Sequence, residues 1–216
     1  MKKIDIQSWE RKKSYLWFSS FSNPTYALSA KINVTPLIQL KNRLKRSFYE
    51  DMLYLVVKAL NGVPAMRLRV VGEEIVEYDA PAPSFTVALE DGLFDICRTE
   101  WNENPVEFCR AVRKGIESTV LSGGNKEFGD SKVDVYYFTC LPWLDFETMT
   151  NPIPDDAETY SIPRICWGKY VKTGDEYHLS VSIQVSHALV DGKPLCDAFA
   201  AIQNNVNDCE RLLIKK

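Results

Sequence analysis

Histidine is scarce in this sequence, with only two residues, and none of the six cysteines forms a Cys-x-x-Cys pair. This scarcity argues against a zinc site, so we expect no metal. No apolar run is long enough to span a bilayer, and the first residues lack the apolar segment of a signal peptide. The net charge of −3 offers no basic surface for nucleic acid or an anionic membrane. We therefore expect a cytoplasmic protein with free, mostly buried thiols that binds neither nucleic acid nor membrane.

The 216 residues also lack a Gly- or Pro-rich linker, an internal repeat and any low-complexity tract. We therefore expect one domain over residues 1–216. Hydrophobic residues make up 45% of the chain and charged residues 25%, which is typical of a globular domain with a sizeable core.

Hydrophobic periodicity predicts a mixture of strands and helices. Strands are expected near residues 26–32, 67–71, 75–78, 84–89, 133–138 and 179–185, and helices near 35–44, 52–60, 104–116 and 194–206. Thr35 and Asn104 each precede a proline, which is typical of an N-cap before a first helical turn. Residues 151–163 are expected to form an irregular surface segment. Because strands and helices do not alternate strictly, we predict an α+β fold, a two-layer sandwich of helices on a mixed, mostly antiparallel sheet.

The two histidines occupy different kinds of position. His178 begins the strand 179–185 and is expected to be an exposed strand-end residue. His187 follows the same strand in phase with its apolar residues, so it should share their buried face where the strand ends. A partly buried imidazole close to Asp191 is suited to general-base catalysis near neutral pH. The alternative is a core histidine that is simply hydrogen-bonded.

Four sequence blocks resemble the chloramphenicol acetyltransferase family of CoA-dependent acyltransferases. Ser186–Gly192 resembles the family's His-His-x-x-x-Asp-Gly signature, and Ile4–Lys12 resembles its opening segment with Trp-x-Arg-Lys/Arg. Leu141–Phe146 resembles a Pro-Trp-x-x-Phe segment, and Trp167–Tyr170 resembles a segment that ends in Lys-Tyr. The order and separations of the blocks fit, and the resemblance covers essentially the whole chain. The acyltransferase cores of 2-oxoacid dehydrogenase complexes carry a close variant of the signature, but they are longer and come with lipoyl domains.

The resemblance implies a homotrimer whose active sites lie between subunits. Acetyl-CoA, the co-substrate, and a small hydroxylated acceptor would enter a channel from opposite ends. Chloramphenicol is the leading candidate for the acceptor. One subunit would supply the catalytic histidine, and its neighbour would supply much of the acceptor pocket. The acceptor hydroxyl would attack the thioester directly in a ternary complex.

The resemblance also implies roles for individual residues. His187 would be the general base, and Asp191 would pair with Arg11 to hold the loop that presents it. Thr139 falls where the family has a serine that stabilises the tetrahedral oxyanion. A strand threonine without a catalytic role is the competing interpretation of Thr139.

Aromatic residues fall where the family binds its two substrates. Phe18, Tyr26 and Phe94 match positions that contact the acceptor, and Trp143 and Tyr170 match positions beside the CoA channel. Each of these five side chains could instead serve only in packing.

The sequence departs from the family pattern in three places, and these departures motivate alternative functions. Ser186 replaces the first histidine of the signature, Cys166 replaces a threonine that supports the transition state through water, and residues 145–163 are more polar than their counterparts. These changes motivate two alternatives, a non-catalytic trimeric ligand-binding or sequestering protein and an O-acetyltransferase for a different acceptor. A subunit of a large acyltransferase assembly is disfavoured by the chain's length.

Overall fold

A computed structural model describes residues 1–90, 92–124 and 132–214 of the chain. Its centre is a mixed sheet in which β9 (Val171–Thr173) pairs with one end of β10 (Glu176–Ser186). The strands follow one another in space as β2 (Thr25–Asn33), β10, β8 (Arg164–Trp167), β7 (Val135–Cys140), β5 (Ala82–Ala88) and β6 (Phe94–Arg98). The β5–β7 and β7–β8 pairs are parallel, and the other pairs are antiparallel. A smaller antiparallel sheet joins β1 (Lys2–Ile4), β4 (Glu74–Glu77) and β3 (Leu68–Val71).

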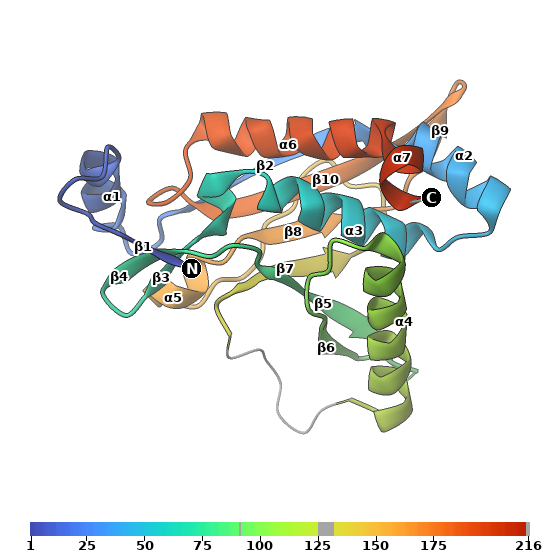
Figure 1. Cartoon of the computed structure of the whole chain (residues 1–216), viewed down its shortest axis with the longest axis horizontal. Coiled ribbons are helices and arrows are strands. Elements are labelled where there is room, and N and C mark those ends of the chain that lie inside the picture. The colour runs from blue at the N-terminus through green and yellow to red at the C-terminus, as the bar shows by residue number, and fades with distance from the viewer. Residues whose placement is uncertain (91, 125–131, 215–216) are drawn as a thin grey trace.

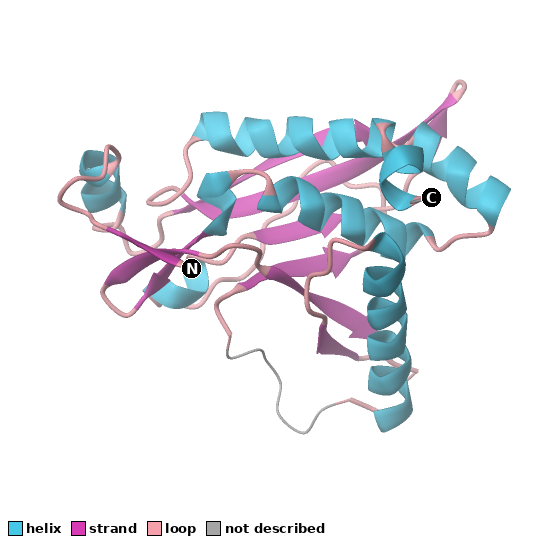
Figure 2. Ribbon diagram, viewed as in Figure 1, coloured by secondary structure: helices cyan, strands magenta, loops and turns pink. Residues whose placement is uncertain are grey.

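Helices cover one face of the main sheet, and Figure 2 shows these two layers. Figure 1 shows α3 (Phe48–Asn61) and α6 (Gly192–Asn207) lying over the strands, with α4 (Pro105–Ser122) beside β5 and β6. Further helices are α1 (Lys12–Phe18), α2 (Thr35–Leu44), α5 (Ala157–Tyr160), α7 (Cys209–Leu213) and a 3₁₀ turn at Pro64–Arg67. The structure therefore confirms the predicted α+β sandwich with its mixed, mostly antiparallel sheet.

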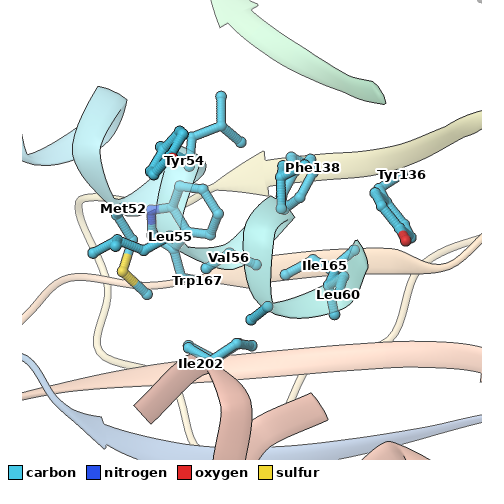
Figure 3. Close-up of a cluster of buried hydrophobic side chains, with 14 of the residues drawn as sticks. Met52, Tyr54, Leu55, Val56, Leu60, Tyr136, Phe138, Ile165, Trp167 and Ile202 are labelled. Atoms are coloured by element: carbon cyan, nitrogen blue, oxygen red, sulfur yellow. The ribbon is translucent and has the colours of Figure 1, made fainter. Parts of the chain in front are cut away.

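The core lies between α3 and the sheet. The apolar residues of α3 from Met52 to Leu60 are buried, and they meet large side chains that alternate positions of β7 and β8 project toward the helices. Figure 3 shows this cluster, with Ile202 of α6 closing one side. Its labelled members are Met52, Tyr54, Leu55, Val56, Leu60, Tyr136, Phe138, Ile165, Trp167 and Ile202.

The second face of the sheet carries polar side chains that hold the segment 145–163. Ser182 of β10 donates to the carbonyl of Met149 at 2.7 Å, and the Asn151 N–H donates to Gln184 Oε1 at 2.6 Å. The expected irregular segment is therefore only partly a surface excursion. It contains the short helix α5 and packs against the sheet, so Asn151 and Thr159 become part of a cavity wall on this face.

One helix start differs from the sequence-based prediction. Val34, not Thr35, is the N-cap of α2, because Asn33 Oδ1 accepts the Thr35 N–H at 3.0 Å. The Thr35 hydroxyl instead accepts the backbone N–H of Tyr177 at 2.8 Å, which ties α2 to β10. The other prediction is confirmed, since Asn104 caps α4 by accepting the N–H of Val106 at 3.0 Å.

All six cysteines are free, as expected, and four of them are buried. Among the described residues, no helix is both long and apolar enough to cross a membrane.

Candidate active site

His187 directly follows β10, and two aromatic rings hold its imidazole. Its backbone N–H donates to the carbonyl of Pro24 at 2.8 Å, next to the start of β2. Phe18, the last residue of α1, stacks on the imidazole with ring centroids 3.9 Å apart and planes 11° apart. The ring of Tyr26 from β2 lies 4.6 Å away. Because the His187 side chain is still 33% exposed, the imidazole is oriented yet open to a reactant.

Arg11 organises the loop that follows His187. Its Nε and Nη2 donate to the two carboxylate oxygens of Asp191 at 2.9 and 2.7 Å. Its remaining hydrogen bonds go to the backbone carbonyls of His187, Ala188 and Leu189 at 3.3, 3.0 and 2.5 Å. A guanidinium carries five donors in a rigid fork, so this one side chain defines the path of the loop.

The charges around His187 favour one tautomer of its ring. The guanidinium of Arg11 holds the pKa of Asp191 below its ordinary value, so this carboxylate stays ionised. His187 Nδ1 lies 3.4 Å from Asp191 Oδ1, and within the described parts of the chain it makes no hydrogen bond. A carboxylate at this distance favours the proton on Nδ1, which leaves the lone pair on Nε2.

Tyr26 is held as a neutral phenol beside the imidazole. Burial raises its pKa to about 12, with a further contribution from the charge of Asp191. Its hydroxyl donates to the carbonyl of Val190 at 3.3 Å. The ring of Tyr26 is thus fixed at both ends, and it forms one wall of the space around His187.

A second group of predicted residues surrounds a cavity at the carboxyl end of β7. Thr139, Phe94 and Trp143 line this cavity of about 590 Å³, together with Tyr49 of α3. Phe94 and Trp143 are 51% and 76% exposed, so much of the wall is open apolar surface. The wall is broad enough for an extended ligand with an apolar portion.

Thr139 also lines a second, smaller cavity on the polar face of the sheet. This cavity has a volume of about 330 Å³, and its walls include Ser84, Asn151 and Arg164. Thr86 is the other residue that both cavities share. Thr139 therefore lies at the junction of a larger, apolar cavity and a smaller cavity with a cationic side chain.

The two groups of residues do not meet within one chain. Strand register places Thr139 opposite Cys166, and Cys166 opposite Ser182 of β10. His187 lies five residues beyond Ser182, so strand geometry separates it from Thr139 by roughly 16 Å along the strands and by two strand spacings across them. In addition, Thr139 faces the polar side of the sheet, while His187 is in phase with the helix-facing residues of β10.

Tyr170 stands apart from the other predicted residues. It packs on Phe48 with ring centroids 5.1 Å apart and on Tyr177 at 6.0 Å, and it lines neither cavity. The predicted pair of Trp143 and Tyr170 therefore does not share a wall.

The two substituted positions are fully enclosed. Cys166 has no exposed surface, and burial raises the pKa of its thiol to about 12, so it remains protonated at neutral pH. Ser186 is 1% exposed, and its hydroxyl finds no partner among the described residues.

Sequence reasoning missed Tyr49, Ser84 and Arg164 as cavity residues. Arg164 offers a signal in hindsight, because it and Cys166 alternate with the apolar Ile165 and Trp167 along β8. That alternation puts a cation on the polar face of a central strand. Ser84 carries no comparable signal, since its neighbours in the sheet come from distant parts of the sequence.

Comparison with known proteins gives consistent matches along the chain. A family model described as chloramphenicol acetyltransferase matches residues 1–203. A chloramphenicol acetyltransferase of Vibrio anguillarum is 25% identical over 216 residues, covering 96% of this chain and 98% of the relative. Another, from Escherichia coli, is 23% identical over 191 residues, covering 88% and 86%.

Solved structures show the same fold. A chloramphenicol acetyltransferase structure matches with a TM-score of 0.82 at 21% identity, covering 95% of this chain and all of that one (100%). The dihydrolipoamide acetyltransferase of Azotobacter vinelandii matches with a TM-score of 0.69 at 12% identity, covering 99% and 94%.

Proposed function

Because the chain belongs to the chloramphenicol acetyltransferase family, we propose that it transfers the acetyl group of acetyl-CoA to a hydroxyl of a small acceptor, with His187 as general base. Members of this family are acyltransferase enzymes, and this chain is one of them. The observation that carries the mechanism is the environment of His187. Its ring is stacked on Phe18, its loop is bound by Arg11, and its side chain remains partly exposed.

The reaction needs one base and no acyl-enzyme. Nε2 of His187 removes the proton of the acceptor hydroxyl as the oxygen attacks the thioester carbonyl carbon. The tetrahedral intermediate then collapses, the carbon–sulfur bond breaks, and the imidazolium returns its proton to the departing thiolate. The products are the acetyl ester and free CoA.

Asp191 and Arg11 act as positioning residues in this mechanism. Both oxygens of the Asp191 carboxylate accept hydrogen bonds from Arg11, so the carboxylate is a poor proton acceptor. Its negative charge near Nδ1 maintains the ring tautomer that leaves Nε2 free.

Thr139 is proposed to stabilise the oxyanion, since it is one of the two hydroxyl residues, with Thr86, that line both cavities, and it holds the position of the family's serine. The larger cavity would bind the acetyl end of acetyl-CoA. Because Phe94 lines this cavity with Trp143, the proposal moves Phe94 from the acceptor pocket, where the resemblance had put it, to the acetyl-CoA side. The smaller cavity would take the acceptor. This arrangement agrees with two substrates that approach from opposite sides.

The active site is proposed to form between copies of the chain in a homotrimer. Neither half of the site is complete alone, because His187 and Thr139 lie at different ends and on different faces of the sheet. Large exposed apolar side chains flank both halves, which supports their burial in an interface. They are Leu16, Trp17 and Phe21 near His187, and Leu93, Phe94, Trp143 and Leu144 near Thr139.

Release of free CoA tests the proposal directly. Acetyl-CoA is supplied with a panel of small alcohols, and chloramphenicol is the first to test because the relatives carry its name. We expect acceptor-dependent release of thiol, and His187→Ala should lower kcat by at least about 100-fold. His178→Ala is the matched control, since His178 lies at the far end of β10 and should leave kcat unchanged.

Two results would contradict the proposal. Unchanged turnover by the His187→Ala variant would remove the histidine from the mechanism. Tight binding of acceptors without release of CoA for any of them would favour the non-catalytic, ligand-binding alternative.

A further inference from the structure

The smaller cavity beside Thr139 contains a buried cation. Arg164 is only 7% exposed, and it enters the cavity wall from β8. Its Nη1 donates to the carbonyls of Thr159 and Ile162, both at 3.1 Å. Among the described residues, no hydrogen bond engages its Nε or Nη2, and no carboxylate lies within ion-pair distance of it.

The guanidinium carbon of Arg164 lies 5.3 Å from the centroid of the Tyr137 ring, but no described carboxylate pairs with its charge. No residue of the cavity wall is acidic. The charge of Asp156 also acts on Arg164 without an ion pair between them, and the Asp156 carboxylate already accepts the N–H of Thr159 at 2.7 Å as the cap of α5. Burial lowers the pKa of Arg164, which expresses the cost of holding a cation there. An arriving anion would offset that cost.

A second polar group faces the same cavity. Strand register aligns Ser84, Tyr137, Arg164 and Gln184 in one row across the sheet. Ser84 is 1% exposed, and its hydroxyl has no partner within the described parts of the chain. A buried hydroxyl without a hydrogen bond is unfavourable, so a polar ligand atom would also satisfy this group.

We infer that the smaller cavity binds a carboxylate, and that the acceptor is a hydroxyl compound that carries one. The carboxylate site does not depend on the proposed acetyl transfer, whereas the statement about the acceptor rests on it. The Nε and Nη2 edge of a guanidinium presents two parallel N–H groups, which match the two oxygens of a carboxylate. Ile96, Pro152 and Pro154 supply an apolar wall for the part of the ligand between its carboxylate and its hydroxyl.

The position of Arg164 suits recognition close to the reacting centre. Thr139 lies opposite Cys166, and Arg164 precedes Cys166 by two residues on the same strand. Such diagonal neighbours in a sheet have Cα atoms roughly 7–8 Å apart. A ligand whose carboxylate binds Arg164 would therefore place its hydroxyl group near Thr139, provided that one aromatic ring separates the carboxylate from the hydroxyl.

Calorimetric titration of the full chain in solution tests the inference with two isosteric ligands. One is 4-(hydroxymethyl)benzoate, and the other is its neutral amide, 4-(hydroxymethyl)benzamide. We expect the wild-type protein to bind the acid at least tenfold more tightly than the amide. This comparison requires no variant to fold.

Variants then assign the preference to Arg164. Arg164→Met should abolish the difference between acid and amide, and Arg164→Lys should retain part of it. A purely structural role, through the carbonyls of Thr159 and Ile162, would weaken both ligands alike. Arg98→Met is the matched control, because Arg98 occupies the same row on β6 but already pairs with Glu100 and Asp134. Its preference for the acid should match that of the wild type.

Equal binding of acid and amide, or no binding of the acid, would overturn the inference. So would a preference that survives in a folded Arg164→Met variant. Failure of the proposed function has a different signature. The acid preference would then persist without any release of CoA, whereas transfer to neutral alcohols without an acid preference would refute only the carboxylate site.

Discussion

At the scale of single residues, the loop after His187 depends on Arg11. Without its guanidinium, the carbonyls of His187, Ala188 and Leu189 would lose their donor, and Asp191 would lose its ion pair. The side chain of Arg11 is only 15% exposed, so water would replace these bonds poorly. The stability of the loop and the orientation of the His187 ring are thereby linked.

Arg11→Met is therefore expected to lower the free energy of unfolding by about 2 kcal/mol, because buried acceptors lose their donors. It should also lower kcat by at least about tenfold. Arg11→Lys should recover only part of both losses, because an ammonium cannot reproduce the fork. Urea unfolding and CoA release measure the two effects. Arg211→Met, which removes an exposed pair with Asp208, should change stability by less than about 0.5 kcal/mol.

The ion pair also predicts a pH dependence. Arg11 depresses the pKa of Asp191 in the folded state below the ordinary value of 3.8. A depressed acid stabilises the fold above its unfolded-state pKa, and this contribution is lost as the pH falls through the folded-state value. The difference in unfolding free energy between wild type and Asp191→Asn should thus be largest near neutral pH and shrink below about pH 4. A difference that stays constant from pH 3 to pH 7 would contradict this linkage.

At the scale of elements, local sequence determines where helix α4 begins. Asn104 and the following Pro105 start the helix as predicted, and the Asn104 side chain accepts the N–H of Val106. Asn104→Ala should lower the free energy of unfolding by about 1 kcal/mol in thermal or urea denaturation. Asn104→Ser keeps an oxygen at the cap and should lose only a few tenths of a kcal/mol. Equal losses from both substitutions would remove the cap as the cause.

The strands show which elements a sequence reveals. β10 is visible because one of its faces meets the core, while its polar face binds the segment 145–163. β8 escaped prediction because it has only four residues, which is too short for the alternation of Arg164 and Cys166 with Ile165 and Trp167 to stand out. β6 escaped prediction because it is a short strand at the edge of the sheet, paired only with β5 among the described strands.

At the scale of the whole molecule, the separation of His187 from Thr139 predicts complementation between two inactive variants. His187→Ala retains the Thr139 half of the site, and Thr139→Val retains the His187 half. If each site draws its halves from different copies, mixed trimers regain about a quarter of the sites after random assembly. Co-refolding of the two variants, followed by CoA release and native mass spectrometry, measures this recovery.

The control is to mix the two separately folded variants without refolding, which should give no recovery while the trimers remain intact. Absence of recovery after confirmed mixing of subunits would show that one chain supplies both groups. A monomeric native mass with full activity would contradict the interfacial site altogether.

The sequence by itself determined the fold class, the main helices and the identity of the residues around His187. The fold class and the helices follow from local periodicity, whereas the residues around His187 follow from the resemblance to a known family. The tertiary structure decided that Phe18 stacks on His187, that Arg11 binds the distant Asp191 loop, and that Thr139 adjoins two cavities. It also decided that Arg164 enters the smaller cavity without a carboxylate partner among the described residues. The placement of Thr139 and Arg164 depends on the register of β8 between β7 and β10, and the contacts of His187 depend on the packing of α1 against the end of β10.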